Sequence, residues 1–122
     1  MGIVGATIRV QSNDELAELA VCRNVGFLIQ PQFNSEDYES FVTSVRSLKP
    51  DLVLVNSYSM IIREDVLSAS RLGGINLHAA LLPRNRGCNP TQWAIINKEF
   101  ETGVTMHEMD SGIDMGAIID QR

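Results

Sequence analysis

Two polar residues, Asn76 and His78, lie two positions apart at the end of a short apolar segment. If Ile75–His78 is a strand, its alternating side chains place the amide and the imidazole on one face. Such a pair can donate hydrogen bonds to a developing oxyanion and can transfer a proton. An arbitrary Asn-x-His more often satisfies backbone groups of a neighbouring loop. The spacing alone therefore leaves the catalytic and the structural role open.

A second group of candidates is the loop Asp110–Gly116, which combines carboxylates with glycines. Its flexible backbone would let a flat ligand lie against main-chain amides. A calcium loop of the EF-hand type is excluded, because the third position from Asp110 is Gly112 and the twelfth is Gln121. A plain turn between two strands explains the glycines, but it does not require Asp114.

Two arginines, Arg84 and Arg86, lie in a loop where a guanidinium could bind a phosphate or a carboxylate. An exposed loop arginine is more often only solvated.

His107-Glu108 begins a metalloprotease motif, but Ser111 stands where H-E-x-x-H needs its second histidine, so that motif is excluded. We expect His107 to be a hydrogen-bonded structural histidine.

Three further residues are expected to have no catalytic role. Cys22 and Cys88 lie far apart without the spacing of a metal or redox motif, and we interpret both as free thiols. Trp93 falls at helical spacing with Ile96, which favours a place in the core.

Strands that alternate with helices would position these candidates, and this pattern predicts an α/β fold with a Rossmann-like, mainly parallel sheet. The expected strands are Gly2–Val10, Phe27–Ile29, Asp51–Val55, Ile75–His78, Gly103–His107 and Gly116–Ile119. The expected helices begin at Asn13 and at Asn34-Ser35, extend over 63–71, and include Trp93 and Ile96. The continuous apolar run Asp51–Val55 predicts a strand buried on both faces. Ligands in such sheets bind beyond the carboxyl ends of the strands, here the loops 57–62, 78–90 and 110–116.

The composition indicates one globular domain over residues 1–122, with 44% apolar and 20% charged side chains. The net charge of −5 and the lack of a Lys/Arg run argue against nucleic acid as a partner. No apolar stretch reaches the length of a membrane span, and the N-terminus does not resemble a signal peptide, so we expect a cytoplasmic protein without a membrane partner.

Three separated segments together resemble the folate-dependent formyltransferase family. They are Asn76-Leu-His78-Ala-Ala-Leu-Leu-Pro83-x-x-Arg86-Gly87, then Pro90-x-x-Trp93-Ala, then Gly103-Val-Thr105-x-His107-x-x-Asp110-x-Gly112-x-Asp114-x-Gly116. The segments follow the family's order, and the resemblance is strongest from about Asp51 to Arg122. It implies 10-formyltetrahydrofolate as formyl donor, no metal, and a Rossmann-like sheet of the formyltransferase type.

Residue by residue, the resemblance makes Asn76, His78 and Asp114 the catalytic residues. Asn76 and a protonated His78 would stabilise the oxyanion formed when a primary amine attacks the formyl carbon, and His78 would also accept the amine's proton. The resemblance also implies main-chain contacts to the pterin and contacts to the acceptor's anionic groups. The pterin contacts are Ser59, Met60, Ile61 and Ile62 with Asp110, Ser111, Gly112 and Ile113, and the acceptor contacts are Arg84 and Arg86.

The expected acceptor is the amino group of a nucleotide-linked amino sugar, because the stretch from Asn76 to Trp93 looks most like sugar N-formyltransferases. A purine precursor ranks lower, since the purine branch typically has Pro-Gly where this chain has Arg86-Gly87. Methionyl-tRNA ranks lower because those enzymes resemble a longer chain with a basic C-terminal domain. A non-catalytic or truncated ligand-binding or interaction module is the alternative from another class, and a nucleotide-binding Rossmann domain is weaker because no G-x-G-x-x-G follows a strand.

Family members usually begin with one more strand and helix and continue further, so we expect the chain to be truncated at both ends and its sheet to be incomplete. A missing strand would leave unpaired edges beside Asp51–Val55. We therefore expect either homo-oligomers formed through exposed sheet edges or a chain that is part of a longer polypeptide.

Overall fold

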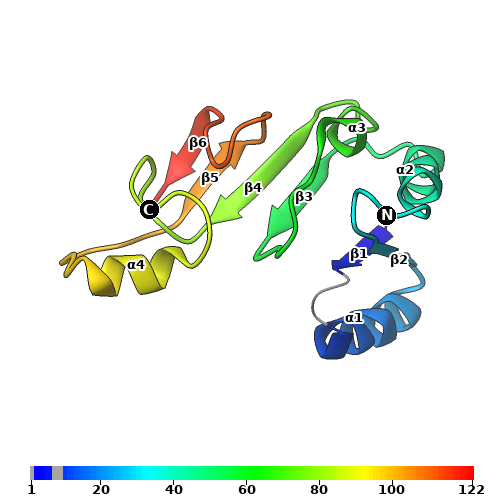
Figure 1. Ribbon diagram of the computed structural model, residues 1–122, viewed down its shortest axis with the longest axis horizontal. Coiled ribbons are helices and arrows are strands. Elements are labelled where there is room, and N and C mark those ends of the chain that lie inside the picture. Colours follow the sequence, from blue (N-terminus) through cyan, green and yellow to red (C-terminus); the bar gives the residue numbers. More distant parts are fainter. Residues whose placement is uncertain (1, 7–9) are drawn as a thin grey trace. The chain divides into compact units, whose positions relative to one another are not determined.

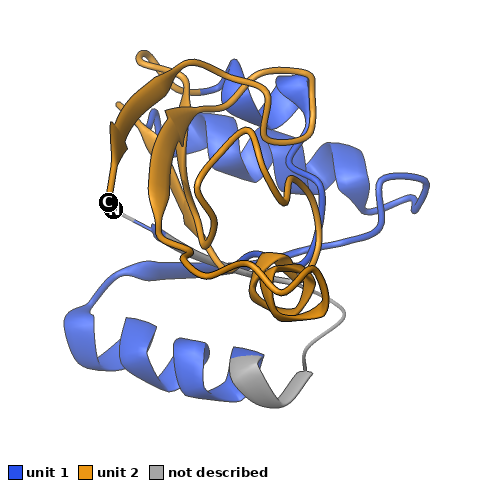
Figure 2. Ribbon diagram, turned by 90° about the vertical axis from the view of Figure 1, so that its left-hand side faces the viewer, with its two compact units in different colours: residues 1–50, 58–69 blue, residues 51–57, 70–122 orange. Residues whose placement is uncertain are grey.

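The computed structural model describes residues 2–6 and 10–122 (Figure 1). The chain forms two compact units, coloured separately in Figure 2. The first unit comprises Met1–Pro50 and Tyr58–Ala69, and the second comprises Asp51–Ser57 and Ser70–Arg122. A single domain over 1–122 stays a prediction. In the described ranges no helix is both long and apolar enough to cross a membrane.

The first unit begins with two parallel strands joined by a helix. β1 (Gly2–Ala6) pairs with β2 (Gly26–Gln30), and α1 (Val10–Arg23) connects them, as a parallel pair requires. The chain leaves α1 through Asn24 in the left-handed region, with φ 51°. Asparagine tolerates that conformation, so the helix can end there and turn directly into β2.

The core of the first unit is an apolar cluster built mainly by α2 (Tyr38–Ser47). One face of this helix carries residues at helical spacing, and α3 (Glu64–Leu67) adds one more side chain. The cluster consists of Tyr38, Phe41, Val42, Val45 and Val66, with Leu28, Ile62 and Ala69 packed against it.

The second unit is built on a four-stranded sheet in the order β3-β4-β5-β6. These strands are β3 (Val53–Asn56), β4 (Gly74–His78), β5 (Thr105–Glu108) and β6 (Ile118–Gln121), and α4 (Pro90–Ile96) lies in the connection from β4 to β5. The α/β class is confirmed. Parallel pairing holds for β1–β2 and β3–β4, whereas β4–β5 and β5–β6 are antiparallel. The short loop between β5 and β6 contains no crossover helix and can join only antiparallel strands.

Three predicted element boundaries are wrong. Asn13 is not an N-cap, because α1 already begins at Val10, a residue that was expected to end the first strand. Residues 7–9 of that expected strand lie outside the described residues. Ser35 does not cap α2, because its hydroxyl donates to the Gln32 carbonyl and α2 begins only at Tyr38.

The helix expected over 63–71 is confirmed only in its first half, because α3 comprises Glu64–Leu67. Its last turn tightens, with the Ala69 amide donating to the Val66 carbonyl. The strand expected at Gly116–Ile119 begins two residues later. A side chain on Gly116 would collide with the Glu108 carbonyl oxygen, so this glycine provides the close approach that precedes β6.

Two predictions of burial are also wrong. Val55 on β3 is buried but Leu54 is 65% exposed, so the strand is not buried on both faces. Successive side chains of a strand point to opposite faces, and on β3 only the face that carries Val55 is covered. Trp93 and Ile96 are exposed rather than in the core, because the seven-residue α4 buries only Ala94.

Candidate active site

The register of β4 against β5 brings the chemistry-bearing residues together. In this antiparallel pair Asn76 lies opposite His107 and His78 lies opposite Thr105. Directly opposed residues of an antiparallel pair have adjacent side chains on the same face. His78, Thr105 and His107 are all buried, so the polar face of these two strands is shielded from water.

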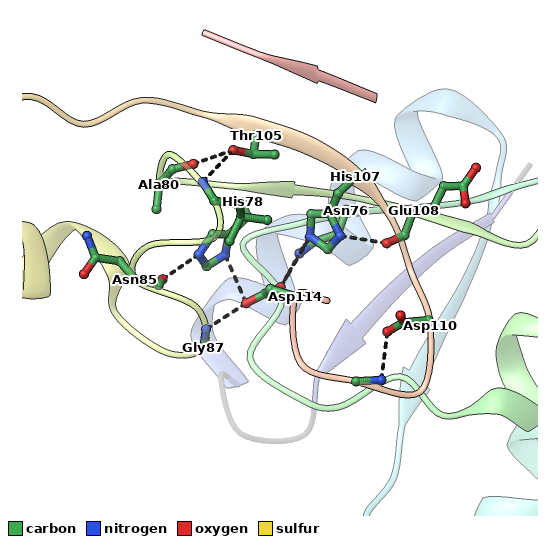
Figure 3. Close-up of polar contacts among 12 residues, drawn as sticks. Asn76, His78, Ala80, Asn85, Gly87, Thr105, His107, Glu108, Asp110 and Asp114 are labelled. Carbon is green, nitrogen blue, oxygen red and sulfur yellow. Dashed lines mark hydrogen bonds and ion pairs between the residues drawn. The ribbon is translucent and has the colours of Figure 1, made fainter. Parts of the chain in front are cut away.

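Asp114 lies at the centre of this face, between the two imidazoles (Figure 3). One oxygen, Oδ1, accepts from Asn76 Nδ2 at 3.2 Å and lies 3.4 Å from His107 Nε2. The other oxygen, Oδ2, accepts from the Gly87 amide at 2.8 Å and lies 3.4 Å from His78 Nδ1. Since its side chain is only 12% exposed, these partners replace the water that a carboxylate would otherwise bind.

The loop after β4 supplies two main-chain contacts through backbone that turns sharply. Asn85 and Gly87 both have positive φ, 54° and 84°. This turn aims the Gly87 amide at Asp114 and the Asn85 carbonyl at His78, whose Nε2 lies 2.8 Å away. The Asn85 side chain donates to both carboxylate oxygens of Glu99 at 3.0 Å, which holds the turn.

The partners of His78 define where its hydrogens are. A carbonyl oxygen only accepts, so Nε2 carries the hydrogen that is shared with Asn85. Nδ1 faces a carboxylate oxygen of Asp114, which favours a hydrogen there as well. Both ring nitrogens therefore face oxygen atoms that can accept a hydrogen bond.

Thr105 fixes the loop that carries these contacts. Its hydroxyl donates to the Ala80 carbonyl at 2.6 Å and accepts from the Leu82 amide at 3.1 Å. Gln121 on β6 donates to the same hydroxyl oxygen at 2.8 Å and to the Leu82 carbonyl at 3.0 Å. The loop that starts after His78 is thus tied to two neighbouring strands.

Asp114, which was expected on a separate loop, therefore contacts both Asn76 and His78 of β4. The predicted acceptor contacts are placed differently. Arg84 and Arg86 are exposed, and Arg84 lies 3.7 Å from Glu101 in an ion pair between exposed side chains. Neither arginine makes a described contact with the three.

The predicted pterin segment 59–62 belongs to the first unit. It lines a hollow of about 320 Å³ whose walls are Gln30, Gln32, Phe33, Ser59, Met60, Ile61 and Arg63. Gln30 holds this segment: its amide donates to the Ile61 carbonyl at 3.1 Å and its oxygen accepts from the Tyr58 hydroxyl at 2.9 Å. Burial raises the pKa of Tyr58 to about 12, so the hydroxyl stays a donor at neutral pH.

The other predicted pterin segment, 110–113, is an exposed turn of the second unit. Asp110 accepts the Gly112 amide at 2.8 Å, which closes the turn, and Ser111 and Ile113 are exposed. The turn leads into Asp114, whose φ of 51° directs its carboxylate toward the strands. Among the residues that the structure describes, no three His, Cys, Asp or Glu side chains are grouped as a metal ion would require.

Sequence reasoning missed three contributors to this site. His107 is the hydrogen-bonded histidine that was expected, but its contact with Asn76 was not. The Asn85 carbonyl and the Gly87 amide were missed because main-chain groups have no sequence signature of their own. The Asn85-x-Gly87 spacing was the available signal, since both residue types favour positive φ.

Comparisons with known proteins give a family match over most of the chain. A family model described as Formyl transferase matches residues 9–122. The methionyl-tRNA formyltransferase of Cyanothece sp. is 41% identical over 109 residues, which are 89% of this chain and 32% of that protein. The chain thus spans about a third of the length of this relative.

Solved structures of two kinds are similar to the whole chain. Glycinamide ribonucleotide transformylase 1 from Geobacillus kaustophilus superposes with a TM-score of 0.79 at 28% identity, covering 98% of this chain and 65% of that one. The formyltransferase PseJ from Anoxybacillus kamchatkensis, in complex with UDP-4,6-dideoxy-4-formamido-L-AltNAc and tetrahydrofolate, gives a TM-score of 0.59 at 26% identity. That match covers all of this chain and 59% of PseJ.

Proposed function

The chain belongs to the formyl transferase family, and from this premise we propose that it transfers a formyl group from 10-formyltetrahydrofolate to a primary amine. The observation that carries the proposal is the contact of Asp114 with both Asn76 and His78 on a buried face. An amide, an imidazole and a carboxylate in contact are the groups that acyl transfer to an amine uses.

The proposed reaction makes one bond and breaks one. The amine nitrogen bonds to the formyl carbon, and the bond from that carbon to folate N10 then breaks. A proton leaves the amine and a proton reaches N10, so the products are a formamide and tetrahydrofolate. The formyl oxygen carries negative charge only in the intermediate, where preorganised positive charge has its largest effect on rate.

His78 is the group we propose for both tasks. As an imidazolium next to Asp114, it stabilises the oxyanion. Through water it passes its Nδ1 hydrogen to folate N10 as the bond to N10 breaks, and it takes up the proton that leaves the amine, so its charge is the same before and after the reaction. Asp114 holds the ring through the contact of its Oδ2 oxygen with Nδ1. Asn76 would take part in stabilising the oxyanion, but both of its amide hydrogens already have acceptors in the protein, so donation to the oxyanion requires one to be exchanged.

We propose that the folate donor contacts the main chain of residues 59–62 and 110–113. The hollow lined by Ser59, Met60 and Ile61 supports the first segment as a binding surface. The closed Asp110 turn supports the second, since its exposed backbone is held in one shape. Tetrahydrofolate in the PseJ structure is in line with a folate ligand.

Two acceptor classes are supported by separate observations. The stretch from Asn76 to Trp93 supports an amino sugar nucleotide, and the PseJ structure contains a formylated sugar nucleotide. The identity of 41% to a methionyl-tRNA formyltransferase supports methionyl-tRNA. The acidic net charge of this chain does not decide against tRNA, because the chain spans only about a third of that relative.

The test is a direct assay of this chain with 10-formyltetrahydrofolate. Separate reactions contain methionyl-tRNA, a set of UDP- and dTDP-linked amino sugars, or glycinamide ribonucleotide, and mass spectrometry detects the formylated product. We expect one acceptor class to be formylated by the wild type and not by His78→Ala. Product from none of the acceptors, together with no calorimetric binding of a stable folate analogue, would favour a non-catalytic module instead.

A further inference from the structure

We propose that His107 is a positioning residue that holds the amide of Asn76 in one orientation. The inference rests on the proposed function, because it takes Asn76 as one of the groups that face the reacting atoms. His107 itself is only 2% exposed and contacts the Asn76 side chain, so we place it as a residue that acts through Asn76.

The hydrogen positions on His107 follow from its two partners. Nδ1 lies 2.7 Å from the Glu108 carbonyl oxygen, which only accepts, so Nδ1 carries a hydrogen. Nε2 lies 3.2 Å from Asn76 Nδ2. An amide nitrogen only donates, so Nε2 must offer its lone pair. His107 is therefore a neutral imidazole with its hydrogen on Nδ1.

The orientation of Asn76 follows in turn. Nδ2 carries two hydrogens and has two acceptors, Asp114 Oδ1 at 3.2 Å and His107 Nε2 at 3.2 Å. If the amide were turned over, its oxygen would face the carboxylate and the imidazole lone pair, and both contacts would be repulsive. The contact with Asp114 determines that the nitrogen end of the amide faces the carboxylate. The second contact, with His107, also fixes the plane of the amide.

The alternative charge state does not fit these contacts. A cationic His107 would have a hydrogen on Nε2 and would pair with Asp114, which lies 3.4 Å away. That hydrogen would then point toward the hydrogens on Asn76 Nδ2, and the amide would have to move. The present contacts are satisfied by one arrangement of hydrogens only, so His107 and Asn76 fix each other.

Two substitutions separate the positioning role from a merely structural one. In His107→Gln the terminal oxygen can take the place of Nε2 and accept from Asn76, while in His107→Asn the terminal amide can take the place of Nδ1 and donate to Glu108. Both variants replace the imidazole ring with an uncharged amide, so each is the control for the other. We expect His107→Asn to lower kcat by about 10- to 100-fold with an unchanged KM for the folate donor, and His107→Gln to restore kcat to within about threefold of the wild type.

Nuclear magnetic resonance supplies a second readout that does not depend on activity. In the wild type, the ¹⁵N spectrum of His107 should show a hydrogen on Nδ1 and none on Nε2. The side-chain amide hydrogens of Asn76 should exchange slowly in the wild type and in His107→Gln, and rapidly in His107→Asn. A hydrogen on Nε2, or equal behaviour of the two variants, would overturn the inference. A wild type that formylates no acceptor would overturn the proposed function instead, and the spectra would still decide the role of His107.

Discussion

The two units contain side-chain clusters of different chemistry, apolar in the first unit and polar in the second. The apolar cluster of the first unit excludes water through packing that has no direction, and four of its five members come from α2. The second unit instead buries a polar cluster, which consists of Asn76, His78, Thr105, His107 and Asp114. Its members come from two strands and a loop, and each contact has a donor and an acceptor.

This difference determines what a substitution does. In the apolar cluster a shortened side chain removes contacts in proportion to its size, and neighbours adjust in part. In the polar cluster a single changed atom can turn an acceptor into a donor and leave its neighbour facing the wrong partner. We therefore expect the polar cluster to govern the rate of reaction and the apolar cluster to govern stability.

The largest expected effect is on the rate, in Asp114→Asn. The new amide has the same shape and tolerates the positive φ, but its NH₂ end now faces a hydrogen-bond donor, either Asn76 Nδ2 or the Gly87 amide. We expect kcat to fall by about 10³-fold. Asp120→Asn is the matched control, because Asp120 is exposed and its carboxylate pairs with the exposed Arg122. Equal kcat values in the two variants would mean that the polar cluster does not govern the rate.

The fold was predictable to the extent that it follows from local patterns. Strands β2, β3 and β4 and helix α2 were expected near their observed positions, because apolar periodicity and prolines are local signals. The antiparallel pairings of β5 and β6 were not predicted, since strand direction depends on how the connection between them runs. Burial of Leu54 and Trp93 was predicted wrongly, because periodicity shows which residues share a face and not whether another element covers it.

The sequence predicted which residues form the site, but it did not predict which of them contact one another. Asn76 and His78 could be placed on one face from their spacing, and the resemblance added Asp114. That His107 lies opposite Asn76 depends on the register of two strands about thirty positions apart, which no local pattern contains. Which group donates and which accepts in these hydrogen bonds could be assigned only from the interatomic distances in the structure.

The second largest effect is expected on stability, in Phe41→Ala. Phe41 is 6% exposed within the apolar cluster, so its removal leaves a cavity and should lower the free energy of unfolding by about 3 kcal/mol. Phe100→Ala makes the same chemical change at a fully exposed position and should change that free energy by less than about 0.5 kcal/mol. Urea unfolding followed by circular dichroism measures both. Similar losses in the two variants would contradict the placement of the apolar cluster.

A smaller effect is expected from Thr105→Val, which keeps the shape of the side chain and removes its hydroxyl. The Leu82 amide then loses its acceptor, which should cost about 1–2 kcal/mol of stability. Hydrogen exchange should accelerate at the Leu82 amide. Thr105→Ser keeps the hydroxyl, so in that variant the Leu82 amide should stay protected even though a methyl group is lost. Equal exchange in both variants would show that the hydroxyl does not hold the loop.

The smallest effect concerns Tyr38, the one member of the apolar cluster with a polar tip. Burial raises its pKa to about 12, and the hydrogen bond from its hydroxyl to Asp65 adds to the shift. Because the unfolded chain ionises near pH 10 and the folded chain only near pH 12, the stabilisation is present below pH 10 and is lost as the pH rises toward 12. The loss should reach about 1 kcal/mol at pH 11. Tyr38→Phe cannot ionise, so between pH 10 and pH 12 its stability should fall less steeply than that of the wild type. Parallel curves in urea unfolding would show that the tyrosine hydroxyl is not buried, and the apolar cluster would then lack the only polar group that makes its stability depend on pH.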